Sequence, residues 1–87
     1  MSHMLMMDVA SLSKYEAALE EFKASIQKHC AQLEADINTY GQYMKDDKSQ
    51  KAIQDTKDAC ADVQRCLGHV DNALDMVRSL KTMIGNL

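Results

Sequence analysis

The side chains best suited to chemistry in this chain are its three cysteines and three histidines. Cys66 and His69 lie three residues apart, so on a helix they would share one face, at a spacing that suits two ligands of a zinc ion. A closed zinc site needs four ligands in one place. If the chain folds back on itself, the residues opposite this pair are Glu21, Phe22 and Ala24, which include no second cysteine or histidine. We therefore expect no metal site and no cofactor.

Cys30 and Cys60 form a second candidate pair, because the same folded-back arrangement makes them neighbours. One interpretation is a disulfide, which requires Cα atoms about 4.4–6.8 Å apart. The other is a pair of small, buried core residues that stay reduced in the cytosol. Cys66 remains as a third thiol under either interpretation.

Acidic side chains are the remaining candidates for catalysis, and their pattern argues against it. In the second half of the chain they fall on the outward side of a helix, beside lysines and arginines, as a solvated face does: Asp55, Asp58, Asp62, Asp71 and Asp75. The sequence shows no nucleophilic triad and no phosphate-binding loop. A pair of long helices also has no cleft that excludes water. We therefore predict that the protein is not an enzyme.

Composition limits the fold and the partners. The chain has 87 residues, a net charge of −3, no proline, three glycines and no tryptophan. A chain of this length forms one domain that buries little surface, so association with another chain is expected. No face gathers enough Lys or Arg to attract nucleic acid, and no apolar run is long enough to span a membrane.

A long helix is predicted at about residues 48–84. Its apolar residues alternate in steps of three and four, which forms one continuous seam: Ile53, Cys60, Val63, Leu67, Val70, Leu74, Val77 and Ile84. Small or apolar residues recur beside the seam at every seventh position. We call these residues the small-residue strip, and they are Ala52, Ala59, Cys66, Ala73 and Leu80. Leu87 would continue the strip. A helix of this design suits close packing against another helix, so the strip is the predicted partner-binding site.

A first helix is predicted at about residues 12–42. Ser13 and Glu16 have the spacing of a capping box, and Ser11 is an alternative start. The apolar residues of this helix again follow a three-four spacing: Leu12, Tyr15, Leu19, Phe22, Ile26, Cys30, Leu33, Ile37, Tyr40 and Met44. A file of alanines on its other face is either plain helical surface or a second, shallow docking strip: Ala10, Ala17, Ala24 and Ala31.

The turn between the helices is predicted at about residues 41–48. Tyr40 and Gly41 mark the bend, and no apolar residue occurs from 45 to 49. Asp46 or Asp47 would cap the second helix, and Gly85 would end it.

Folding the chain near residue 45 brings the two apolar seams together. Ile37 then faces Ile53, and Cys30 faces Cys60. The predicted fold is therefore all-α, with two long antiparallel helices in a hairpin. Two helices cannot cover apolar faces this wide, so we expect pairing into a four-helix bundle, either with a second copy or with a different protein.

The first residues are treated separately. Ser2-His3-Met4 has the form of a cloning remnant, so we expect the native start at Met4, Met6 or Met7 and a disordered segment over 1–7. The single hairpin domain would then span 8–87. The apolar run Leu5-Met6-Met7 is too short for a secretory signal peptide.

These features resemble those of the WXG-type, or ESAT-like, small helical hairpins of type VII secretion, in the branch without tryptophan that accompanies LXG toxins in Gram-positive bacteria. The resemblance covers Val9 to Ile84 and rests on the length, the two helices and an aromatic residue beside a glycine at the bend. The Trp-x-Gly motif of the family is absent, and Tyr40-Gly41 is the nearest equivalent. Tyr43 and Asp47 match the family's export motif of an aromatic residue followed four positions later by an acid, although most members carry it after the second helix.

The resemblance implies a non-catalytic adaptor. Such a protein binds the helical N-terminal region of a toxin, or another small hairpin, and helps to target it for export. We would then expect the protein in the cytoplasm, or exported through a type VII system. Two alternative functions stay open: a homodimeric structural or regulatory bundle with no secretion role, and a phage or plasmid regulator that acts on a host protein. For Tyr43 the alternative is a residue that only closes the tip of the hairpin against Met44 or Ile37.

Overall fold

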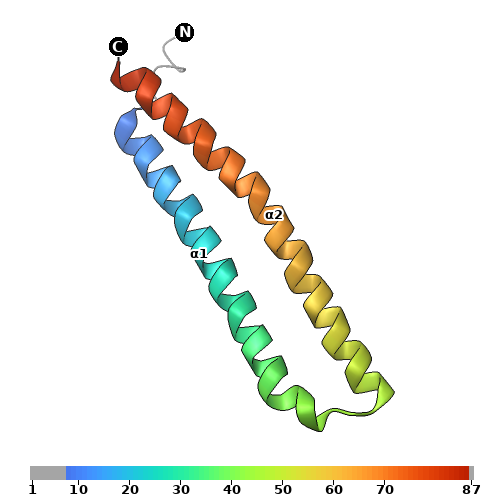
Figure 1. The fold of residues 1–87 in the computed structure, drawn as a ribbon. Helices are drawn as coiled ribbons and strands as arrows, with labels where there is room; N and C mark the ends of the chain where they lie inside the picture. The colour runs from blue at the N-terminus through green and yellow to red at the C-terminus, as the bar shows by residue number, and fades with distance from the viewer. Residues whose placement is uncertain (1–7, 87) are drawn as a thin grey trace.

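The computed structural model describes residues 8–86 and is a single helical hairpin (Figure 1). Helix α1 (Val9–Tyr40) is followed by a short 3₁₀ turn, η2 (Gly41–Tyr43), and then by helix α2 (Asp47–Gly85). The two long helices run antiparallel, so the start of α1 and the end of α2 lie together, opposite the bend. The predicted all-α hairpin is therefore confirmed. The expectations for residues 1–7 and for Leu87 fall outside the described residues.

Helix α1 begins at Val9, earlier than predicted, because Asp8 caps it. The Ser11 amide donates to Asp8 Oδ1 over 2.7 Å, and this bond lowers the pKa of the Asp8 carboxyl. The capping box predicted at Ser13 is wrong: Ser13 lies inside the helix, and the Glu16 carboxylate bonds to α2 instead. A carboxylate one turn earlier satisfies the free amides of the helix start, so the helix extends back to it.

The bend lies slightly later than the Tyr40-Gly41 pair that was predicted to mark it. Gly41 has helical angles (φ −60°, ψ −27°) and its carbonyl accepts the Met44 amide over 3.1 Å, so the chain is still coiled there. The helical conformation is lost at Met44 (φ −102°, ψ 82°). The turn therefore spans residues 44–46, and no special backbone conformation requires a glycine at position 41.

Of the two caps predicted for helix α2, Asp46 and Asp47, the structure shows Asp46. The Ser49 amide donates to Asp46 Oδ2 over 3.1 Å, so Asp46 is the cap and Asp47 lies in the first turn. The Gln50 side chain donates to the Met44 carbonyl and closes the turn. Gly85 is the last helical residue, as expected of a helix stop.

The two seams meet in the predicted register. Cys30 and Cys60 are both buried, and Ile37 and Ile53 both approach Gly41. Six residues form the buried core, and all belong to the predicted seams: Leu12, Cys30, Cys60, Leu67, Leu74 and Val77.

Most of the predicted first seam is not core. Of its ten residues only Leu12 and Cys30 are buried, and five of its large side chains are exposed: Tyr15, Phe22, Leu33, Tyr40 and Met44. The reason is the thinness of the molecule, which measures 62 × 18 × 17 Å and is therefore one layer of two helices. Each helix has a single neighbour, so only the centre of each apolar stripe is covered.

Candidate functional site

One broad side of the hairpin is polar, and ion pairs join the helices across it. Near the chain ends, Glu16 accepts from Lys81 and from Arg78, each over 2.7 Å, and Arg78 also donates to Glu20 over 2.8 Å. Further along, Lys23 and Asp71 pair at 2.5 Å. The hydrogen bonds from Lys81, and then from Arg78, hold the pKa of the Glu16 carboxyl below its ordinary value.

The polar character of this side continues toward the bend. There Glu34, Asn38 and Lys57 surround a shallow hollow of about 330 Å³ beside Ile37. This side therefore carries charged and hydrogen-bonding side chains from the ion pairs near Glu16 to the hollow beside Ile37.

The opposite side holds an apolar groove between the helices in the half of the hairpin near the bend. Its larger part has a volume of about 400 Å³. The lining residues of this part are Ile26, His29, Cys30, Leu33, Asp55, Thr56, Ala59, Cys60 and Val63. A smaller part, of about 220 Å³, continues it toward the bend and shares Leu33 and Thr56 with it. It is completed by Asp36, Ile37, Tyr40, Gly41, Met44, Ala52 and Ile53. We call the two parts together the groove.

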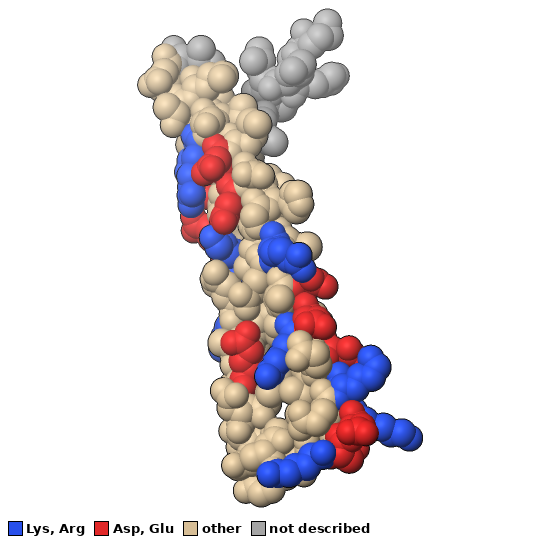
Figure 2. Space-filling view, turned by 45° about the vertical axis from the view of Figure 1, so that its right-hand side comes forward, with Lys and Arg blue, Asp and Glu red and all other residues tan. Residues whose placement is uncertain are grey.

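The same side remains apolar in the half near the chain ends. Phe22 and Tyr15 precede His29 by seven and fourteen residues, so they lie on the face of α1 that lines the groove. Their exposed fractions are 52% and 51%. On α2 the small-residue strip continues from Ala59 at intervals of seven. The groove, Tyr15, Phe22 and the strip together are the apolar face. Figure 2 shows uncharged surface running along the molecule between groups of charged side chains.

The structure places the small-residue strip at the edge of this face. Ala52, Ala59 and Cys66 are exposed, while Ala73 and Leu80 are half-buried. The alanine file of α1 is also exposed, at Ala10, Ala17, Ala24 and Ala31.

Sequence reasoning missed the contribution of α1 to the apolar face, because it assigned Tyr15, Phe22, Leu33 and Tyr40 to the core. The sequence did contain a signal that these side chains would be exposed, namely their position within the apolar stripe. Tyr15 and Phe22 lie seven residues apart in the file next to the most buried residues, at the edge of the stripe.

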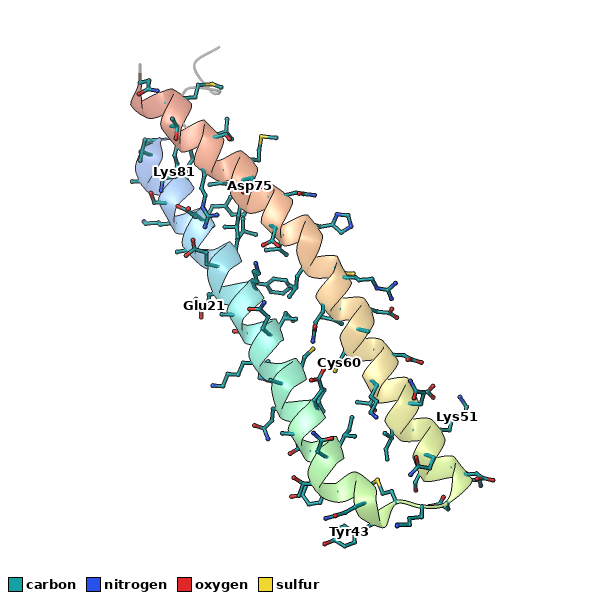
Figure 3. The ribbon with its side chains drawn as sticks, in the orientation of Figure 1. Glu21, Tyr43, Lys51, Cys60, Asp75 and Lys81 are labelled. Carbon is teal, nitrogen blue, oxygen red and sulfur yellow. The ribbon has the colours of Figure 1, made fainter. Side chains whose placement is uncertain are left out.

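The cysteines differ in their surroundings. Cys30 and Cys60 are free, buried thiols at the floor of the groove, and Cys60 points toward α1 (Figure 3). Removal from water, and then a hydrogen bond with Cys30, raise the pKa of the Cys60 thiol. Cys66 is exposed. Among residues 8–86, no three His, Cys, Asp or Glu side chains gather closely enough to hold a metal ion.

The candidate export residues lie at the tip of the hairpin. Tyr43 is 78% exposed, so its ring buries little against Met44 or Ile37, contrary to the tip-closing alternative (Figure 3). Asp47 is exposed in the first turn of α2. The break at residues 44–46 separates the two side chains, so their spacing of four is not one turn of a continuous helix.

No helix in the described part of the chain is sufficiently long and apolar to cross a membrane. Comparison of the sequence and fold with known protein families, curated proteins and solved structures finds no match.

Proposed function

We propose that this protein is a non-catalytic adaptor that docks a second helical hairpin on its apolar face and so completes a four-helix bundle. The observation that carries the proposal is the contrast between the two sides. One side satisfies its charged groups with cross-helix ion pairs, and the other exposes a groove with aromatic and small residues around it. A large exposed apolar surface bordered by polar groups is typical of a protein-binding site.

The shape of the molecule supports a helical partner. The radius of gyration is 19.4 Å, whereas a compact chain of this length has about 12 Å. The groove runs parallel to both helices, so an elongated partner covers it and a round ligand does not. Two further helices would bury Phe22 and Leu33 and convert one layer into two.

The proposed partner is the helical N-terminal region of an LXG-type toxin or another small hairpin, which the complex delivers to a type VII secretion system. The resemblance to WXG-type hairpins supports this role. Tyr43 and Asp47 contribute a second argument, because both are exposed at the tip, away from the apolar face, where secretion machinery can reach them in the bound complex. The protein would act in the cytoplasm before export.

A matched pair of substitutions tests the docking role. Ala59→Glu places a carboxylate at the rim of the groove, whereas Ala61→Glu places one on exposed α2 surface outside it. Co-expression with the N-terminal region of a toxin encoded beside the gene should give a stable complex for the native chain and Ala61→Glu. The Ala59→Glu complex should be lost. Equal binding by both variants would refute docking on the apolar face.

A second experiment separates export from docking. Tyr43→Ala combined with Asp47→Ala should leave the complex intact, because neither residue lies on the apolar face, and should abolish secretion of the toxin. Unchanged secretion would remove the targeting role and leave the binding role standing.

A further inference from the structure

The groove carries acidic groups on both of its rims, and their charge indicates the kind of helix that it accepts. The inference rests on the proposed docking role of the apolar face and adds the chemistry of the partner. Apart from His29, the titratable side chains with a carboxylate or a basic group that line the groove are Asp36 and Asp55. Within the described part of the chain, the lining includes no lysine or arginine.

Asp36 and Asp55 lie on opposite rims at nearly the same level. Ile37 and Ile53 both approach Gly41, so these two isoleucines mark one level of the hairpin. Asp36 directly precedes Ile37 on α1, and Asp55 follows Ile53 by two residues on α2. One carboxylate therefore borders the groove from each helix, close to the point where its two parts join.

Neither carboxylate is neutralised by the other helix. Asp36 is half-buried and accepts from the Gln32 amide over 3.1 Å. Asp55 accepts from Lys51 over 3.3 Å, in an exposed pair within α2 that contributes little. The cross-helix ion pairs of residues 8–86, such as those of Glu16, lie on the polar side and reach neither carboxylate. Both carboxylates therefore keep acceptor positions for a cation that a partner brings.

A cation beside Asp36 would also meet an aromatic ring. Tyr40 lies four residues after Asp36, lines the same part of the groove and is 58% exposed. Residues four apart on a helix are neighbours on its surface. An arginine that bonds to the Asp36 carboxylate can therefore place its flat guanidinium against the Tyr40 ring, which a lysine does less well.

A second copy of this chain does not supply such cations. Its apolar face carries Tyr15, Phe22 and the small-residue strip near the chain ends, and the same two carboxylates near the bend. The described cations Lys23, Arg78 and Lys81 are bonded on the polar side. Charge complementarity therefore indicates a different protein as the occupant of the groove.

We propose that the partner inserts into the groove a helix whose apolar ridge is bordered on both edges by arginine or lysine, with an arginine beside Asp36. The carboxylates of Asp36 and Asp55 select this helix and reject one with acidic edges, because like charges would then face each other at both rims. Ala59 lies closer to the seam than Asp55, beneath the apolar ridge. A carboxylate introduced at position 59 is therefore buried among apolar side chains and still disrupts docking.

Two synthetic helical peptides serve as probes. Each has about 21 residues, which is long enough to cover the groove, and carries leucines at the three-four spacing of an apolar ridge. One peptide has arginine on both sides of the ridge, and the other has glutamate at the same positions. In titration calorimetry, the native chain should bind the arginine-bordered peptide at least about 10-fold more tightly. This preference should shrink as NaCl is added, because salt screens exposed charges.

Charge-removing variants identify the selecting residues. Asp36→Asn combined with Asp55→Asn should weaken binding of the arginine-bordered peptide by about 5- to 20-fold. The matched control is Asp58→Asn combined with Asp75→Asn, which removes the same net charge from exposed surface outside the groove. It should change the affinity by less than about 2-fold. Asp36→Arg should reverse the preference and strengthen binding of the glutamate-bordered peptide.

The outcomes are distinct. Equal affinity for the two peptides, or equal losses in the two double variants, overturns the proposal. Failure of both peptides to bind also overturns it, and a toxin complex that still depends on Ala59 would then leave the proposed function standing. Binding of the arginine-bordered peptide through Asp36 and Asp55, without binding of a toxin region, supports the proposal and refutes the toxin partner. A native chain that sediments as a dimer and excludes both peptides identifies a second copy as the occupant and overturns the proposal.

Discussion

Lys81 Nζ donates to Glu16 Oε1 over 2.7 Å and so joins the last turns of α2 to the second turn of α1 on the polar side. Arg78 binds the other carboxylate oxygen. Glu16 is therefore the acidic centre that ties the two helices together where the chain ends meet.

These ion pairs make the stability of the fold depend on pH in the acidic range. The bonds from Lys81, and then from Arg78, lower the pKa of Glu16 below its ordinary value of 4.5. A carboxyl with a lowered pKa stabilises the fold fully above its ordinary pKa, and the contribution is lost as the pH falls through the lowered value. We predict that the melting temperature declines below about pH 4.5, and that Glu16→Gln makes the decline shallower.

Thermal unfolding followed by circular dichroism over a series of acidic pH values measures this effect. Glu21→Gln is the matched control, because Glu21 lies on the outer edge of α1, away from α2 (Figure 3). An acid profile for Glu16→Gln that overlays the native profile would show that the ion pairs add no stability. Asp8 and Asp46 also have lowered pKa values through their capping bonds, so some acid dependence should remain in both variants.

Gly41 offers a prediction that runs against the sequence-based view of the bend. A Cβ at this position would lie 3.4 Å from Ile53 Cδ1 and 3.8 Å from Ile37 Cγ2, which are ordinary contact distances, and φ is −60°. Gly41→Ala should therefore stabilise the hairpin by about 0.4–1 kcal/mol, because it restricts the unfolded chain.

Gly68→Ala is the companion variant. Gly68 lies in the middle of α2, and a Cβ added there would meet open space. The substitution should stabilise by about 0.5–1 kcal/mol. Urea unfolding measures both changes. A destabilised Gly41→Ala beside a stabilised Gly68→Ala would mean that the bend does require glycine.

The general fold could be predicted because one sequence pattern determines it. Residues such as Leu67 and Leu74 recur at helical spacing without proline, so two helices and their inner faces follow directly. The prediction that Cys30 faces Cys60 required only the position of the turn. These are local and periodic properties, which a sequence carries explicitly.

The start of α1 and the limits of the core could not be predicted in the same way. Asp8 precedes the first buried residue by a full turn, and Ser13 with Glu16 imitates a cap although Glu16 is used across the hairpin. Phe22 and Leu33 belong to the same stripe as Leu12 and Cys30, and only the number of layers in the molecule decides which of them are covered. Spacing within one helix carries no information on that number.

Core packing can be tested at Leu67, which is 6% exposed. Leu67→Ala should lower the free energy of unfolding by about 2–5 kcal/mol, because it removes apolar contacts and leaves a cavity between the helices. Gln64→Ala, on the exposed surface of the same helix, should change it by less than about 0.5 kcal/mol. Similar effects of the two substitutions in urea unfolding would contradict the assignment of Leu67 to the core.

The three cysteines should react with an alkylating reagent at clearly different rates. Cys30 and Cys60 are buried and Cys66 is exposed, and burial raises the pKa of Cys60, so less of the reactive thiolate forms there. In the folded protein, iodoacetamide should modify Cys66 first. Denaturation should make all three thiols reactive, which excludes a disulfide between Cys30 and Cys60. Mass spectrometry of timed samples provides the measurement, and modification of Cys60 as fast as Cys66 would contradict its buried position.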